Sequence, residues 1–139
     1  MTIALWCLLA AGILPQLFGM YAKASKGFDN NNPREYLARQ EGKKARAVAA
    51  MANGYEGLPL FIAAVLVAHL IPLLNPSHVV NQSTINMLAI GYIATRIAFG
   101  FLYIAGLGTL RSLVWFGLWG WGVLLGCLLF RLKYRNCGM

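Results

Sequence analysis

The stretch RAVAAMANGYEGLPLFIAAVLVAHLIP, residues 46–72, decides the fold of this chain. From Gly57 to Leu74 there are 18 residues without a formal charge, which is about the length that a helix needs to cross a membrane. Asn53 and Glu56 lie at the leading edge of this span, three residues apart and so on one helical face. Polar groups in an apolar span are costly and usually face a bundle interior, a partner or a cavity. We therefore expect the functional site in this stretch.

The composition of the whole chain indicates that its solvent is lipid. Of its 139 residues 59% are hydrophobic, and the mean hydropathy is +0.61, which is more apolar than a soluble domain of this size. The net charge is +8, but seven of the twelve Lys and Arg residues lie between Lys23 and Arg46, where they set the topology. No groove-reading element accompanies this charge, so we expect no nucleic-acid partner.

The hydropathy pattern predicts an all-α integral membrane protein, a single domain with four transmembrane helices. The spans are expected at about residues 2–22, 47–74, 84–104 and 113–130, with a basic cytoplasmic loop at 23–45. The basic tail after the last span favours the opposite orientation. The first loop is given more weight because it holds more charge.

Several local signals predict how these helices begin and pack. Asn32 as a cap, Pro33 at the first helical position and Glu35 predict a helix that runs on into the second span, with only Gly42 interrupting it. Pro15 should kink the first span and free a carbonyl. The Ala and Gly residues from 45 to 57, and the pair Gly122 and Gly126, predict close contacts between helices.

Metal and disulfide chemistry are not expected. His69 lies near the far end of the second span, and no second ligand is spaced to join it, so it is interpreted as an interfacial hydrogen-bonding residue. Cys7, Cys127 and Cys137 are an odd set without C-x-x-C spacing, which supports neither a disulfide framework nor a zinc site.

Glu56 and Arg96 are expected at the same depth in the membrane. At 1.5 Å per residue, Glu56 lies about 14 Å below the cytoplasmic start of its span, and Arg96 about 12–15 Å below the cytoplasmic end of the third. One interpretation is a buried ion pair that fixes the register of two helices. The other is a site for an anionic ligand at the cytoplasmic surface, because the ion pair does not use Arg46, Tyr103 or Arg111.

The chain resembles a known family in the combination of these features. Four short spans, a long basic first loop, the N-x-x-E of RAVAAMANGYEGLPLF, and R-x(6)-Y followed by a loop RS are similar to MAPEG, the membrane-associated proteins of eicosanoid and glutathione metabolism. NPREYLARQEG and LRSLVWF look most like a bacterial branch of it. The resemblance covers nearly the whole chain. It implies a multi-pass protein of the bacterial inner membrane, a homotrimer that binds glutathione between subunits near the cytoplasmic face.

The resemblance also implies roles for single residues. Asn53 and Glu56 match the motif of the second helix, and Arg96 and Tyr103 match positions of the third. Of these residues, Asn53, Glu56 and Tyr103 would orient glutathione. Arg111 matches the arginine that is proposed to activate the glutathione thiol.

The arginine set departs from the family pattern at one position. Ala49 stands where catalytic members carry an arginine, four residues before the motif asparagine, and only Arg46 remains nearby. Arg46 and Arg96 are then expected to meet the glutathione carboxylates.

Three functions are compatible with these features. The first is a glutathione-dependent transferase or peroxidase that acts on a lipophilic electrophile from the bilayer, with Arg111 as the catalytic residue. The second is non-catalytic binding of a lipid or small amphiphile, which Ala49 favours. The third is a small multidrug-type transporter. Such transporters use a carboxylate in the first helix, and span 2–22 has none.

Overall fold

A computed structural model describes residues 1–24, 27–74 and 81–117, and this part of the chain is helical, without strands. Its helices are α1 (Ile3–Lys23), α2 (Pro33–Ala38), α3 (Gly42–Leu74) and α4 (Gln82–Ala105). Residues 108–117 are helical as well. Most of the expected fourth span, 113–130, lies outside the described residues. The pair Gly122 and Gly126 lies there too.

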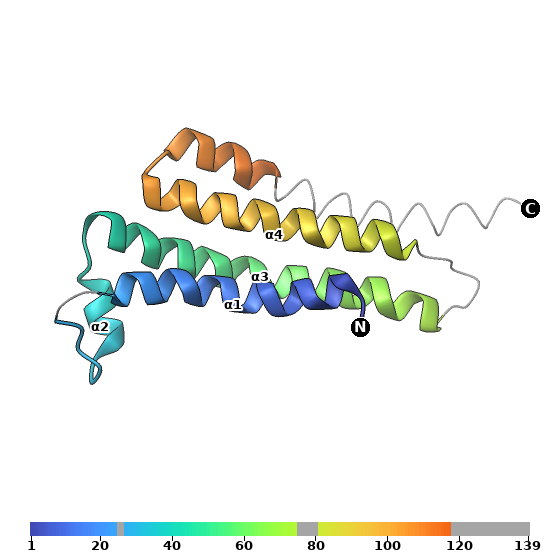
Figure 1. Ribbon diagram of the computed structural model, residues 1–139, viewed down its shortest axis with the longest axis horizontal. Coiled ribbons are helices and arrows are strands. Elements are labelled where there is room, and N and C mark those ends of the chain that lie inside the picture. Colours follow the sequence, from blue (N-terminus) through green and yellow to red (C-terminus); the bar gives the residue numbers. More distant parts are fainter. Residues whose placement is uncertain (25–26, 75–80, 118–139) are drawn as a thin grey trace, which may run out of the picture.

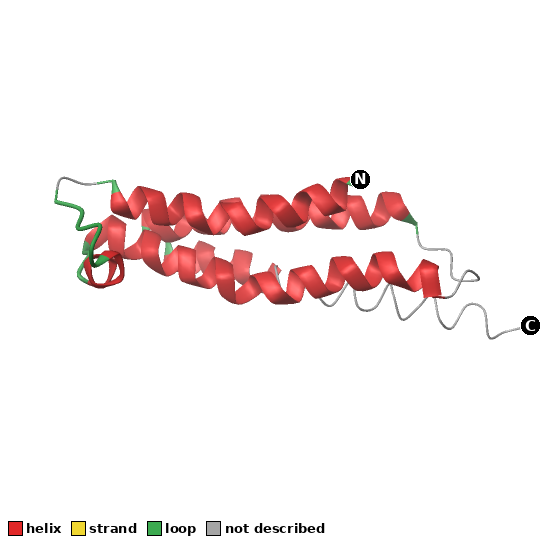
Figure 2. Cartoon of the chain, turned by 90° about the horizontal axis from the view of Figure 1, so that it is seen from below, coloured by secondary structure: helices red, strands yellow, loops and turns green. Residues whose placement is uncertain are grey.

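Three long helices form the body of the molecule. α1, α3 and α4 lie side by side, and short α2 lies at one end (Figures 1 and 2). Each of the three is long and apolar enough to cross a membrane. Lys44 contacts Ala24 while His69 contacts Thr2, so α3 runs antiparallel to α1. The fold is thus that of an all-α membrane protein, as the hydropathy pattern predicts.

The helix is interrupted between α2 and α3, where the sequence predicts an almost continuous helix. α2 begins with Pro33 at its first turn, as expected, but the side chain of Asn32 makes no capping hydrogen bond. Residues 39–41 are not helical, and Gly42 has a φ of +59°, in the left-handed region that favours glycine. The expectation of a continuous helix is therefore wrong. Gly42 lets the chain change direction before α3 starts.

Small residues allow α1 and α3 to pack closely. A Cβ added to Gly54 would lie 2.7 Å from Cγ of Pro15, and one added to Gly19 would lie 2.6 Å from Sδ of Met51. Both distances are shorter than van der Waals contact. Position 54 needs a glycine because the Pro15 ring is rigid, whereas at position 19 the flexible Met51 side chain would have to move. The Gly54 contact agrees with the predicted small-residue flank, and it places the Pro15 ring against the backbone of α3.

Basic side chains from the first turns of α3 donate hydrogen bonds to carbonyls at the C-terminal ends of two other helices. Lys44 Nζ donates to the carbonyl of Ala24, just after α1, at 3.1 Å, and Arg46 Nε donates to the carbonyl of Ile104, in the last turn of α4, at 2.9 Å. The last carbonyls of a helix have no partner within it, and the helix dipole favours a cation there. We call this end of the bundle, where α1 and α4 finish and α3 begins, the basic end.

Candidate functional site

The first part of the site lies between α3 and α4, two helical turns inside the basic end. We call it the inner cluster, and it consists of Asn53, Glu56, Tyr92 and Arg96. Arg96 Nη1 donates to Oδ1 of Asn53 at 3.0 Å and to its carbonyl at 3.4 Å. Nδ2 of Asn53 in turn donates to Oε2 of Glu56 at 3.4 Å. The amide of Asn53 thus stands between the two opposite charges.

A direct ion pair between Glu56 and Arg96 is not formed. Within the described ranges the structure records one salt bridge, and it joins Arg39 to Glu35 at the surface of α2. Glu56 and Arg96 lie at the same level, as their positions in the sequence predict, since Asn53 contacts both of them. The ion-pair interpretation needs correcting, because Asn53 is the residue that meets the guanidinium.

Glu56 lies on the exposed side of the inner cluster. Arg96 is half-buried, whereas Glu56 is exposed on the surface of α3. The only hydrogen bond of its side chain to another described residue is the long one from Asn53. A carboxylate at this depth in a membrane carries a large desolvation cost unless it is paired. The exposed oxygens of Glu56 are therefore suited to a cationic group from outside this bundle.

The second part of the site lies at the basic end, and we call it the end cluster. It consists of Arg46, Tyr103 and Arg111. The guanidinium of Arg111 stacks over the ring of Tyr103, with Cζ 4.3 Å from the ring centroid. Arg46 contacts the same turn of α4 through the Ile104 carbonyl. Arg46 and Arg111 thus both lie at the end of α4.

A left-handed glycine shapes the chain between Tyr103 and Arg111. Gly106 ends α4 with a φ of +81°, and the amide of Leu107 donates to the carbonyl of Leu102. This is the glycine-terminated helix end that reverses the chain. The helical residues 108–117 then fold back along α4 (Figure 1), which brings Arg111 to Tyr103.

The two clusters lie on corresponding faces of their helices. Arg46 precedes Asn53 by seven residues and Tyr103 follows Arg96 by seven, so each step is almost two turns and about 10.5 Å along the axis. One carboxylate lies deep and two guanidinium groups lie at the end. The site is therefore an elongated strip with a carboxylate and a guanidinium, Glu56 and Arg96, at its inner end and two guanidinium groups at the other.

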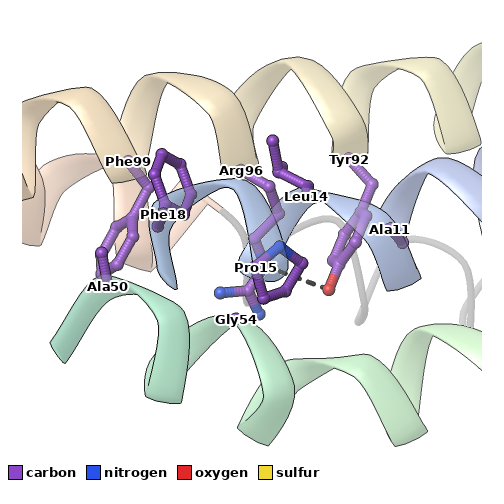
Figure 3. Close-up of a pocket in the computed structure, with 9 residues that line it drawn as sticks. All are labelled: Ala11, Leu14, Pro15, Phe18, Ala50, Gly54, Tyr92, Arg96 and Phe99. Atoms are coloured by element: carbon purple, nitrogen blue, oxygen red, sulfur yellow. Dashed lines mark hydrogen bonds between the residues drawn. The ribbon is translucent and has the colours of Figure 1, made fainter. Parts of the chain in front are cut away.

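A small cavity borders the inner cluster on the side facing α1. Nine residues line it: Ala11, Leu14, Pro15, Phe18, Ala50, Gly54, Tyr92, Arg96 and Phe99. Figure 3 shows Arg96 and Tyr92 reaching from α4 toward Pro15 and Gly54. The space open to the centre of a water molecule is about 10 Å³, which is about enough for a single water. This cavity is too small for a larger ligand.

Tyr92 is the member of the inner cluster that the sequence analysis missed. Its hydroxyl accepts a hydrogen bond from Arg96 Nε at 3.0 Å and donates one to the carbonyl of Gly57 at 3.3 Å. Tyr92 precedes Arg96 by four residues, the spacing at which side chains on a helix meet. That spacing was a signal that could have identified it.

A further group of polar side chains joins the three helices at the end opposite the basic end. Oγ1 of Thr2 lies 2.9 Å from Nε2 of His69, whose Nδ1 lies 2.8 Å from the carbonyl of Val65. Oδ1 of Asn86 accepts from the amide of Ala4 at 3.1 Å and so caps α1 from α4. These contacts agree with His69 as a hydrogen-bonding residue. The group is separate from the candidate site, since Asn86 lies six residues before Tyr92, about 9 Å along α4.

These features define a class, namely helical membrane proteins with a charged strip between neighbouring spans. The chain belongs to the MAPEG family, whose sequence pattern matches residues 3–131. No curated protein and no solved structure matches the chain. The expectation drawn from the sequence resemblance is confirmed at the level of the family.

Proposed function

We propose that the chain is a glutathione-dependent transferase or peroxidase that acts on lipophilic electrophiles dissolved in the bilayer. The observation that carries this proposal is that an exposed carboxylate, Glu56, lies at the inner end of the strip while Arg111 lies at the other end. Glu56 is free to receive the ammonium group of glutathione, and Arg111 is held over Tyr103 where it can meet an anion.

The chemical role of Arg111 is electrostatic. A guanidinium next to a thiol favours the thiolate and lowers the pKa of that thiol. Glutathione supplies the thiol, and Arg111 stabilises the negative charge on its sulfur after the proton has left to water. The thiolate then forms a bond to the electrophilic carbon of the second substrate, and either a leaving group departs as an anion or the displaced C=C electron pair takes a proton from water. With a peroxide it bonds to one oxygen, the O–O bond breaks, the alkoxide takes a proton from water, and a second glutathione converts the sulfenic acid to the disulfide and water.

The exposed position of the strip supports an assembly. The cavity between α1, α3 and α4 has room for about one water, so a tripeptide does not fit in it. In a membrane the outer side of the strip needs a cover that excludes lipid. A second copy of the chain provides it in the homotrimer that the family resemblance implies, and native mass spectrometry from mild detergent should show three copies.

The test is a titration with glutathione, followed by the ultraviolet absorbance of its thiolate. The absorbance should rise with the wild-type protein and vanish with Arg111→Ala, while the variant remains a folded oligomer. If Arg111 only contacts lipid phosphates, the substitution lowers expression and leaves the absorbance unchanged. If the wild type binds no glutathione at millimolar concentration, the transferase proposal fails.

The second candidate function is non-catalytic binding of a lipid or small amphiphile. Two observations favour it: Ala49 replaces an expected arginine, and Arg46 Nε is already bound to Ile104. Under this function the strip holds a charged headgroup and no thiolate forms. Retention of lipid through purification, without glutathione binding, would be the expected result.

A further inference from the structure

Tyr92 is fixed more firmly than any other polar residue of the inner cluster. It is 9% exposed, and its ring stacks on Phe61 with 3.9 Å between centroids and 7° between planes. Its hydroxyl donates to the carbonyl of Gly57, so its remaining lone pairs face Arg96. The position of this oxygen is therefore set by both α3 and α4.

Arg96 takes its orientation from that oxygen. Nε donates to Tyr92 and Nη1 donates to Asn53, so two of the three guanidinium nitrogens are held by groups of this chain. A Cβ added to Gly57 would overlap Nη2 of Arg96, so the guanidinium lies against bare backbone. Because the guanidinium is planar, two fixed nitrogens fix the whole group.

Asn53 takes its orientation from Arg96. A guanidinium only donates hydrogen bonds, so the amide must present its oxygen to Arg96. The NH₂ of the amide then faces the other way, toward Oε2 of Glu56 at 3.4 Å. An amide turned by 180° would place NH₂ against the guanidinium and its oxygen against the carboxylate, and both contacts would be repulsive.

We propose that Tyr92 is a positioning residue for ligand binding, which acts through Arg96 and Asn53 to hold the Glu56 carboxylate in place for a ligand ammonium. The inference rests on the proposed function, in which Glu56 receives the ammonium of glutathione. It gives Arg96 a role different from the carboxylate contact expected from the sequence. Arg96 acts inside the chain, and the residue that meets the ligand is Glu56.

The experiment compares glutathione with its analogue in which the α-ammonium group is replaced by hydrogen. Affinities are measured for both ligands by isothermal titration in detergent. The wild type should prefer glutathione, and Tyr92→Phe should reduce that preference about 5- to 10-fold, as expected for one lost hydrogen bond of about 1 kcal/mol. Affinity for the analogue should stay the same. Tyr92→Phe keeps the ring that stacks on Phe61.

The matched control is Tyr21→Phe, which removes a hydroxyl from an exposed tyrosine of α1. It should leave both affinities unchanged. If Tyr92→Phe does not fold, Arg96→Lys provides the same test, because an ammonium cannot hold Tyr92 and Asn53 in the same fixed geometry. It too should reduce the preference for glutathione and spare the analogue.

Two results would overturn the proposal. Equal weakening of both ligands by Tyr92→Phe would show a general structural role, and an unchanged preference would show that Tyr92 does not reach Glu56. Failure of the proposed function looks different, because the wild type would then bind neither ligand. Thiolate absorbance at saturating glutathione should be the same in wild type and Tyr92→Phe, since Arg111 is untouched.

Discussion

The guanidinium of Arg96 lies directly against the Cα of Gly57, in space that a side chain at position 57 would occupy. A Cβ at Gly57 would overlap Nη2 and lie 2.7 Å from Cζ. The glycine therefore makes room for a charged group between two membrane helices. Glycine has a low helix propensity, and α3 tolerates it at position 57 because the Arg96 side chain fills the space and joins α3 to α4.

Gly57→Ala should displace Arg96 and lower the free energy of unfolding in detergent by about 1–3 kcal/mol, as overpacking usually does. Thermal unfolding followed by circular dichroism measures the effect. Gly12→Ala is the matched control, because no heavy atom lies within 4 Å of its added Cβ. The control should be neutral or stabilise the helix by up to about 1 kcal/mol. Equal effects of the two substitutions would contradict this packing.

Asn53 and Arg96 should be coupled in a double-mutant cycle. Because Nη1 and Oδ1 are 3.0 Å apart, Asn53→Ala and Arg96→Met should show a coupling of about 0.5–3 kcal/mol in stability. Glu56→Gln and Arg96→Met should couple only while Asn53 is present. Coupling of Glu56 to Arg96 that persists in an Asn53→Ala background would restore the direct ion pair.

Arg46→Met should weaken the basic end, because it leaves the carbonyl of Ile104 without its donor. The expected loss is about 0.5–1.5 kcal/mol in the free energy of unfolding, the usual worth of one hydrogen bond. Denaturant titration in mixed micelles measures it. Lys43→Met is the control, since Lys43 is exposed and makes no hydrogen bond to another described residue. If both variants unfold at the same midpoint, Arg46 does not cap α4.

The Tyr103 ring should matter to Arg111 more than the Tyr103 hydroxyl does. Under the proposed function, Tyr103→Phe keeps the aromatic face and should retain most of the thiolate absorbance of bound glutathione. Tyr103→Leu removes a cation–π interaction worth about 0.5–2 kcal/mol, and the absorbance should fall. Equal signals from the Phe and Leu variants would show that the stacking does not place Arg111.

Asn86→Ala should loosen the end opposite the basic end, because the Ala4 amide then loses its acceptor. Cys7 lies one turn further along α1 and is buried at 9% exposure, so its thiol reports opening of this end. In a background of Cys127→Ser and Cys137→Ser, Asn86→Ala should react several times faster with a membrane-permeant maleimide. Ser83→Ala, at an exposed position on the same turn of α4, should react like the parent.

Hydropathy and helix geometry sufficed to predict the helical membrane fold and the common level of Glu56 and Arg96. Glu56 and Arg96 do lie at one level, since depth depends only on the rise per residue. Their pairing depends on the rotation of each helix about its axis and on the side-chain rotamers. Those come from packing against a third helix, which the sequence does not specify. The hydrogen-bond partner of Arg96 is therefore Asn53 and not Glu56, which was the expected partner.

Two other features depended on contacts that a linear pattern does not contain. Gly42 was noted as an interruption, but its positive φ and the turn before α3 follow from where α2 has to lie. Tyr92 stood at a recognisable spacing from Arg96, yet an aromatic residue in an apolar span is usually core. Only its hydroxyl, held between Gly57 and Arg96, identifies it as part of the site.

The dependence of Arg96 on α3 has a consequence for biogenesis. Among the described residues, the hydrogen-bond partner of Arg96 outside α4 is Asn53 of α3. The Pro15–Gly54 contact lies within the first 74 residues. Moving an arginine into the centre of a bilayer costs about 2.5–3.5 kcal/mol on insertion scales. Chains are made from the N-terminus, so α1 and α3 can associate before α4 leaves the ribosome. The newly made hairpin then offers the arginine a polar partner at the moment of insertion.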